Sequence, residues 1–451
     1  MKPLLTTLIF LSSSLLVIGS VMVKPQIRIS LGKNYRFKLE TYFLAALLGP
    51  LFLFAFGLLS PAQSLSSLFS TDVSNPLKIL VLFFSMVFLS TYLDKTGFFA
   101  WCAQLSFKAS GGNPKALFFV LYASVSILTI FTSNDIVILT FTPFIYHFAI
   151  RGNLNPLPFL IAEFFAANTF SMILYIGNPT NIFLASAFSL DFFTYARWMF
   201  LPGLTAGVCN LVLLYLTFKK DLLSSTKIQF DNSDIILKDK PGTLIGTLHL
   251  AAAIVLLSLA PYIHLEMWSI AAFTAVSLIL ILFMKTVFTR KESGLKATFS
   301  SLPWPVIPFI ISMFLMVNAL ASSGITLSIA QLLDNTEKGN LLQSTLTYGI
   351  SSALLCNIIN NIPMTVALGA VLSSGTHSLS NILAVALGSN LGANFTPIGA
   401  LAGIMWMSIL KEKSVNLSFA TFTGYGLKIS GLTLIASLLV LAFQFMLWGK
   451  P

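Results

Sequence analysis

Charged residues are scarce in this chain. Asp, Glu, Lys and Arg make up 9% of its 451 residues and hydrophobic residues 56%, with a mean hydropathy of +0.88. Soluble domains carry roughly 25% charged residues. This composition excludes an ordinary soluble domain and predicts an all-α polytopic membrane protein.

Cysteine and enzyme motifs are also lacking. Three cysteines without a CxxC pair exclude a disulfide framework and a thiolate metal site. The chain has no HExxH, no GxSxG at a suitable depth and no second acid to pair with Asp135, so we expect no enzyme activity. The net charge of +11 lies in short clusters between apolar runs, which favours membrane orientation over nucleic-acid binding.

Ten apolar runs satisfy the requirement of about 20 residues per crossing. Two longer apolar regions have polar centres, which is typical of re-entrant hairpins that enter and leave on one side. The expected crossings are 4–23, 41–60, 77–95, 157–190, 198–218, 243–262, 268–287, 304–322, 379–410 and 424–447, with hairpins at about 116–150 and 340–375. The runs 157–190 and 379–410 contain Gly, Pro and Asn and are expected to be broken helices. Short helices in the membrane interface are expected at 98–110 and 325–334.

The basic loops all lie on one membrane face if the two hairpins do not cross. These loops are 24–40, 95–115, 219–242, 285–303 and 411–423. We therefore expect insertion in the cytoplasmic (inner) membrane with both termini outside. Residues 1–218 and 243–451 then form two repeats of the same order and opposite orientation, joined by a cytoplasmic linker at 219–242, the plan of secondary transporters.

The first repeat has polar stretches at a hairpin tip and in a broken helix. Ser133, Asn134 and Asp135 occupy the tip, and an acid within a membrane costs at least about 2.5 kcal/mol. Asp135 is therefore our candidate for cation or proton coupling, with capping of the following helix as the alternative. The broken helix offers oxygens to a hard cation such as Na⁺ or donors to an anion; its candidate binding residues are Gly177, Asn178, Thr180 and Asn181.

The second repeat has a matching pair of polar stretches without any acid. We therefore expect the coupling ion to favour the first half-site. Candidates at the second hairpin tip are Asn360, Asn361, Pro363 and Thr365, and those in the broken helix are Asn390, Gly392, Asn394, Thr396, Pro397 and Gly399.

Glu163 lies about two turns inside the first broken helix. It could act as a proton relay or simply reach the interface, and we favour the interface.

The segments TSNDIVILTFTP, GNPTN, NNIP and LGANFTPIGALAGIMW resemble the ion transporter superfamily, most closely its arsenite permease (ArsB) branch, with the related NhaD and citrate or dicarboxylate carriers. The resemblance covers roughly residues 40–447. It implies one cation site, possible for Na⁺, at Ser133, Asn134, Gly177 and Asn178. It implies the other at Asn361, Thr365, Asn394 and Thr396. It also implies a homodimer and, for an arsenite permease, a soluble ATPase subunit.

The chain departs from the arsenite permeases at two positions. Asn168 and Asn390 stand where those proteins have acids, so the resemblance leaves the substrate open. The leading hypothesis is a secondary active transporter of a small anion or oxyanion, of the arsenite/antimonite or carboxylate type, coupled to H⁺ or Na⁺. The alternative is an Na⁺/H⁺ antiporter of the NhaD type. No cofactor beyond the coupling ion is expected.

Overall fold

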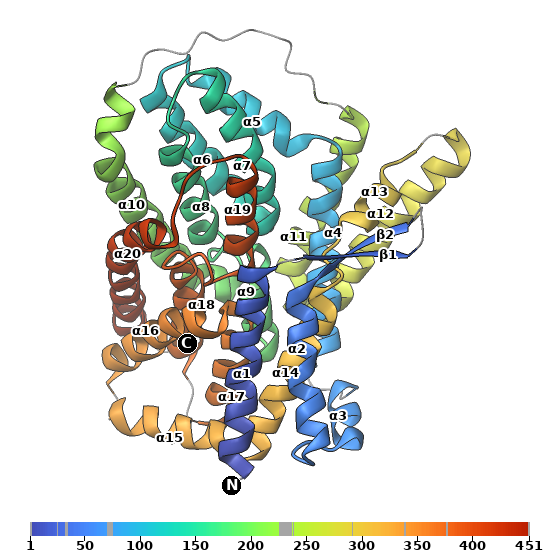
Figure 1. The fold of residues 1–451 in the computed structure, drawn as a ribbon, viewed down its shortest axis with the longest axis vertical. Helices are drawn as coiled ribbons and strands as arrows, with labels where there is room; N and C mark the ends of the chain where they lie inside the picture. The colour runs from blue at the N-terminus through green and yellow to red at the C-terminus, as the bar shows by residue number, and fades with distance from the viewer. Residues whose placement is uncertain are drawn as a thin grey trace.

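The chain is helical almost throughout (Figure 1). The computed structural model describes residues 2–24, 26–31, 35–69, 75–224, 237, 239–290, 292–337, 340–375 and 378–449. Within these ranges, eight helical stretches are long and apolar enough to cross a membrane, and four shorter apolar helices accompany them. The predicted all-α membrane fold is therefore confirmed.

The first part of the chain contains four helices and a β-ribbon. Their bounds are α1 (Lys2–Val23), β1 (Gln26–Leu31), β2 (Tyr35–Glu40), α2 (Thr41–Ala55), α3 (Pro61–Leu68) and α4 (Pro76–Lys95). The antiparallel pairing of β1 and β2 was not predicted, because the basic residues at 24–40 suggested a loop. Their alternation of polar and apolar residues is typical of strands. Helix α2 is shorter than the expected crossing, since Gly57 adopts a φ of +64° and Pro61 begins α3.

Each half contains one helical hairpin followed by one broken helix. The first half contains α5 (Phe98–Ala109), α6 (Pro114–Phe131), α7 (Asn134–Arg151), α8 (Leu157–Phe170), a 3₁₀ turn (Tyr175–Gly177), α9 (Pro179–Ala187) and α10 (Phe192–Ser224). The second contains α11 (Lys240–Ile263), α12 (Met267–Thr289), α13 (Leu295–Ser301), α14 (Val306–Ser322), α15 (Ile325–Glu337), α16 (Leu341–Ile359), α17 (Asn361–Ser374), α18 (Leu379–Gly392), α19 (Leu401–Glu412) and α20 (Phe419–Trp448). In Figure 1, α6 and α7 lie towards one end of the molecule and α16 and α17 towards the other.

Helices α8 and α18 form the centre of the molecule. Apart from Leu157 and Phe170 in α8 and Leu379 in α18, all of their residues are buried. A helix buried on all sides needs no polar face, which explains why neither has an amphipathic pattern. Helix α8 packs against α6, α7 and α10, and α18 packs against α16, α17 and α20. The first segment of each broken helix, α8 or α18, is thus held rigidly by its neighbours.

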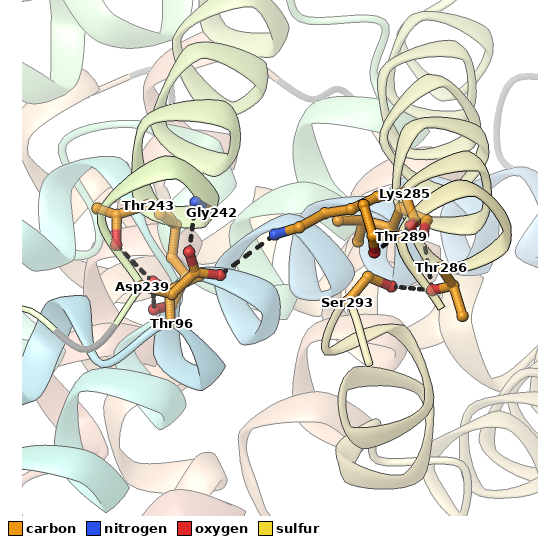
Figure 2. A network of polar contacts seen from close by, with 10 residues as sticks. Thr96, Asp239, Gly242, Thr243, Lys285, Thr286, Thr289 and Ser293 are labelled. Carbon is orange, nitrogen blue, oxygen red and sulfur yellow. Dashed lines mark hydrogen bonds and ion pairs between the residues drawn. The ribbon is translucent and has the colours of Figure 1, made fainter. Parts of the chain in front are cut away.

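A polar cluster fixes the end of the inter-repeat linker to α4 (Figure 2). The backbone N–H of Asp239 donates to the carbonyl of Thr96 at 3.3 Å, and the Thr243 hydroxyl donates to that of Thr96 at 2.9 Å. The Asp239 carboxylate caps α11 at Gly242 N–H and lies 3.6 Å from Lys285 Nζ. These contacts attach the second half to the start of the connection into α5. The predicted cytoplasmic linker at 219–242 stays a prediction, since residues 225–236 and 238 lie outside the described residues.

We expect Gly388→Ala to lower the thermal unfolding midpoint, because its Cβ would lie 2.1 Å from the Gly349 carbonyl oxygen on α16. Overpacking of this kind costs about 1–3 kcal/mol. The measurement is thermal unfolding of the detergent-solubilised protein followed by tryptophan fluorescence. Gly431→Ala on α20 is the control, because no atom lies within 4 Å of its added Cβ. Equal midpoints for the two variants would contradict the close packing of α16 and α18.

Candidate functional site

The two broken helices unwind at the centre of the molecule. Residues 171–178 separate α8 from α9, and residues 393–400 separate α18 from α19. At the first break, the Asn178 side chain accepts hydrogen bonds from the N–H and hydroxyl of Thr180, at 3.1 and 3.0 Å, and Pro179 occupies the first turn of α9. Gly177 approaches the Ser171 carbonyl so closely that a Cβ would lie 2.5 Å from it. The sequence GNPTN therefore ends one helix segment and begins the next.

Asn390 of α18 reaches across into the break of the first half. Its Oδ1 accepts from Ser171 Oγ and from Asn178 Nδ2, both at 3.0 Å. Its Nδ2 donates to Asn181 Oδ1 at 2.6 Å and to the Ala386 carbonyl at 2.7 Å. Asn181 in turn donates to the Ser171 carbonyl at 3.0 Å. One side-chain amide from the second half thus forms hydrogen bonds with three polar side chains at the first break.

Asn168 of α8 makes the reciprocal connection. Its Nδ2 donates to Asn394 Oδ1 in the second break at 3.0 Å. Its Oδ1 accepts from Asn134 Nδ2, at the tip of the first hairpin, at 2.9 Å. Asn168 therefore links the first hairpin tip to the break of the opposite half.

The tip of the second hairpin is fastened to the second break. Asn357 Oδ1 accepts from the Thr396 hydroxyl at 2.6 Å, and its Nδ2 donates to the Gly392 carbonyl at 2.8 Å. Asn360 Nδ2 donates to the Ile398 carbonyl at 3.1 Å, and the Asn361 N–H donates to the Gly399 carbonyl at 3.0 Å. These four bonds satisfy carbonyls and side chains that the break leaves without helical partners.

Asn360 has a strained backbone at this tip. Its φ of 71° and ψ of 155° belong to a region that is essentially restricted to glycine. The contacts of its side chain with the Ile398 carbonyl and with the N–H of Ile362 offset that strain. The backbone here is therefore held by the surrounding polar contacts.

Three buried amide atoms at the breaks and tips have no partner among the described residues. They are Asn134 Oδ1, Asn361 Oδ1 and Asn394 Nδ2. Each would cost about 1–3 kcal/mol if nothing bound to it. Two acceptors and one donor are thus available to a bound ion or solute. Within the described ranges, no group of three His, Cys, Asp or Glu could hold a metal ion.

A small cavity of about 10 Å³ adjoins the first hairpin tip. Thr132 and Ser133 of the tip and Pro179 of the first break form one wall, and α4 forms the other with Phe83, Met86, Val87 and Ser90. The tip and the break of the first half therefore face α4 together.

The structure brings six of the predicted residues into one network. Asn134, Asn178, Asn181, Asn390 and Asn394 are joined directly or through Asn168 and Ser171. The Thr180 hydroxyl donates to Asn178 of this network, and the Thr365 hydroxyl lies 3.4 Å from that of Ser389. Other predicted residues shape the backbone of the tips and breaks: Gly177, Pro363, Gly392, Pro397 and Gly399.

Asp135 lies at the tip but outside this network. It makes no ion pair within the described part of the chain, it is partly exposed, and it lies within electrostatic range of Tyr42 on α2. Its role in coupling stays a prediction.

The prediction for Glu163 was wrong. Its side chain is 1% exposed and does not reach the interface. Both carboxyl oxygens lie 3.0 Å from the Thr142 hydroxyl of α7. Position 163 faces the molecule's interior because α8 is enclosed by its neighbours, with Phe164 packed against Trp406 and Phe422. The proton-relay alternative stays a prediction.

Sequence reasoning missed three members of the network as site residues. Asn168 was noted only for its departure from the arsenite permeases, and Ser171 and Asn357 were not selected at all. The position of Asn168 could have identified it, because Asn168 precedes the first break by the same short interval by which the predicted Asn390 precedes the second. The side chains of Asn168 and Asn390 contact residues of the opposite half. The residue pattern along one helix does not reveal such contacts.

The Citrate transporter family model (CitMHS) matches residues 41–379 of this chain. The chain belongs to that family. It is 28% identical over 375 residues to the arsenical pump membrane protein of Escherichia coli (strain K12), covering 80% of this chain and 85% of that protein. It is 25% identical over 392 residues to an uncharacterized transporter of Mycobacterium tuberculosis (strain ATCC 25618 / H37Rv), covering 84% and 88%.

A solved structure shares the fold of this family member. The YdaH transporter of Alcanivorax borkumensis, described as having an unusual topology, superimposes with a TM-score of 0.54 at 15% identity, covering 99% of this chain and 100% of that one. The predicted resemblance to ion transporters is confirmed. The protein is therefore a multi-pass membrane protein of a transporter family.

We expect Asn390→Ala to lower the unfolding midpoint and to reduce transport at least about tenfold. It leaves Ser171, Asn178 and Asn181 without their shared partner, and each neutral hydrogen bond contributes about 0.5–1.5 kcal/mol. Thermal unfolding and initial uptake rates in proteoliposomes measure the two effects. Asn416→Ala, at an exposed position, should match the wild type. Wild-type behaviour of Asn390→Ala would contradict a role for the crossing contact.

Proposed function

We propose that this protein is a secondary active transporter of a small anion or oxyanion, driven by H⁺ or Na⁺ through alternating access. The observation that carries the proposal is the pair of crossing amides, Asn168 and Asn390, beside three buried amide atoms without partners. Discontinuous helices that meet at the centre of inverted repeats are the binding sites of secondary transporters. The relatives, among them an arsenical pump membrane protein, support transport as the function class.

The helix ends at the site suit an anion beside a cation. Four helices, α7, α9, α17 and α19, begin at the tips and breaks, and four others, α6, α8, α16 and α18, end there. Helix N-termini carry about half a positive charge with free N–H groups, and C-termini carry exposed carbonyls with the opposite charge. The helix N-termini would bind the solute, and the helix C-termini would bind Na⁺.

The side chains favour a weakly charged solute. The polar groups of the network are amides and hydroxyls, and none of its described members is Lys or Arg. Charge-assisted hydrogen bonds from Arg or Lys are the strongest way to bind a polyanion such as citrate. An arsenite- or antimonite-type oxyacid, or a monocarboxylate, needs only neutral donors and acceptors, and we rank these solutes first.

Asp135 carries the second candidate function, an Na⁺/H⁺ antiporter. It lies next to the unpaired Asn134 Oδ1, and a carboxylate with an amide oxygen is a suitable pair of ligands for Na⁺. In that version the exchanged cation itself is the cargo.

We also propose a homodimer in the inner membrane with both termini outside and, for arsenite-type transport, a soluble ATPase partner. No enzyme activity and no cofactor beyond the coupling ion belong to the proposal. The transporter family to which the chain belongs and the multi-pass fold support the membrane location.

Proteoliposomes with an imposed pH or Na⁺ gradient should accumulate at least one labelled solute from a set of arsenite, antimonite, carboxylates and inorganic anions. The expected flux collapses when the gradient is dissipated. Dye-monitored proton release on adding Na⁺, without any solute, identifies the antiporter instead. If neither protons nor any of these solutes move in response to a gradient, both the anion transporter and the Na⁺/H⁺ antiporter are excluded.

Glu163→Gln and Asp135→Asn should separate the two coupling ions. If Glu163 carries the proton, Glu163→Gln abolishes uptake driven by the pH gradient but retains solute counterflow, because exchange needs no net proton movement. Loss of Na⁺-driven uptake in Asp135→Asn, again with counterflow retained, assigns Na⁺ coupling to Asp135. Gradient-driven uptake that persists unchanged in both variants would exclude both carboxyl groups as coupling sites.

A further inference from the structure

A hollow of about 460 Å³ lies between α10 and α20, far in sequence from the hairpin tips. Arg197, Phe200 and Leu201 of α10 form one wall, and Gln444 and Trp448 of α20 form the other. It is an open hollow at the protein surface and not an enclosed pocket. Neither the transport network nor the capping of the breaks uses any of these residues.

Gln444 is the polar group that this hollow leaves unexplained. Its side chain is 3% exposed, and both Nε2 and Oε1 lack a hydrogen-bond partner among the described residues. A buried amide requires both a donor and an acceptor nearby, most of all where lipid replaces water. The missing partner must therefore present an acceptor and a donor together.

Arg197 supplies an unpaired positive charge at the same hollow. It is exposed and makes no ion pair within the described part of the chain. Its guanidinium lies 5.8 Å from the centroid of the Trp198 ring, which is stacked on Phe445 at 3.8 Å. The acid that begins this helix, Asp191, accepts instead from the Thr194 N–H at 2.9 Å. The charge thus rests on a rigid aromatic support and is free to meet an anion.

The surface around the hollow is suited to hydrocarbon chains. Leu204 and Val208 of α10 are 41% and 54% exposed, and Phe443 of α20 is 52% exposed. Trp448 is 56% exposed at the end of α20, as expected for a tryptophan at the membrane interface. Charged, amide and apolar groups therefore follow one another in the order of a lipid's headgroup, glycerol region and acyl chains.

We propose that this hollow binds the headgroup of an anionic phospholipid of the phosphatidylglycerol type. The phosphate accepts from the Arg197 guanidinium in a charge-assisted hydrogen bond. The Gln444 amide donates to a phosphate or ester oxygen and accepts from a headgroup hydroxyl, which satisfies both of its unpaired atoms. The acyl chains lie along the exposed apolar residues of α10 and α20. Phosphatidylcholine, whose headgroup has neither O–H nor N–H, lacks the matching donor.

Native mass spectrometry of the full-length protein in detergent tests this site. The probes are phosphatidylglycerol, phosphatidylcholine with the same acyl chains, and inorganic phosphate, each combined with thermal unfolding. The wild type should retain phosphatidylglycerol and unfold at a higher temperature in its presence. Arg197→Gln and Gln444→Leu should each weaken that binding about tenfold or more.

Two controls keep the result interpretable. Arg151→Gln, an exposed arginine at the end of α7, should bind phosphatidylglycerol as the wild type does. Gln444→Leu without lipid should unfold at or above the wild-type temperature, because it removes an unpaired buried amide. This result separates lost binding from lost folding.

Four outcomes would overturn the proposal. Equal retention of phosphatidylcholine would remove the anionic specificity, and an equal stabilisation by inorganic phosphate would identify a free anion as the ligand. Unchanged phosphatidylglycerol binding in both Arg197→Gln and Gln444→Leu would place the lipid elsewhere. A dimer mass that disappears in either variant would assign the hollow to a second copy of this chain.

Discussion

The need to satisfy every backbone polar group inside a membrane governs this structure. Two helices stop midway through the molecule. Carbonyls of the second break accept from Asn357, Asn360 and Asn361 of the same half, and side chains of the two breaks pair across the halves. Asn390 pairs with the first break, and Asn168 pairs with the second. These crossing side-chain contacts join the two halves of the chain into one site. The same requirement explains why the site is made of amides, which donate and accept within one side chain.

Close packing places these amides where they meet. Helix α18 approaches α16 so tightly that a Cβ at Gly388 would collide with the α16 backbone. The surface that α4 presents to the first tip is mainly apolar, with Phe83, Met86 and Val87. Apolar surfaces lose few directional contacts when they slide past one another. The interior of the two broken helices is thus held by directional polar contacts, whereas the boundary with α4 is mainly apolar.

The sequence allowed the helices, the hairpin tips and both breaks to be predicted, because Gly, Pro and Asn interrupt long apolar runs at those points. GNPTN, for example, combines a capping Asn with a Pro in the first turn. The β-ribbon was missed because its basic residues outweighed its alternating pattern. The burial of Glu163 and the pairing of Asn168 with Asn394 depend on which helices enclose α8. Such long-range neighbours are not encoded in local spacing, so only the three-dimensional arrangement reveals them.

The two hairpin tips are attached to their breaks with unequal strength. The second is fastened by Asn357, Asn360 and Asn361, whereas the first reaches the network through the single bond from Asn134 to Asn168. Opening at the second tip would have to break several hydrogen bonds together, while opening at the first breaks one. The second tip and its break therefore behave as one rigid body, whereas the first tip is the less constrained of the two.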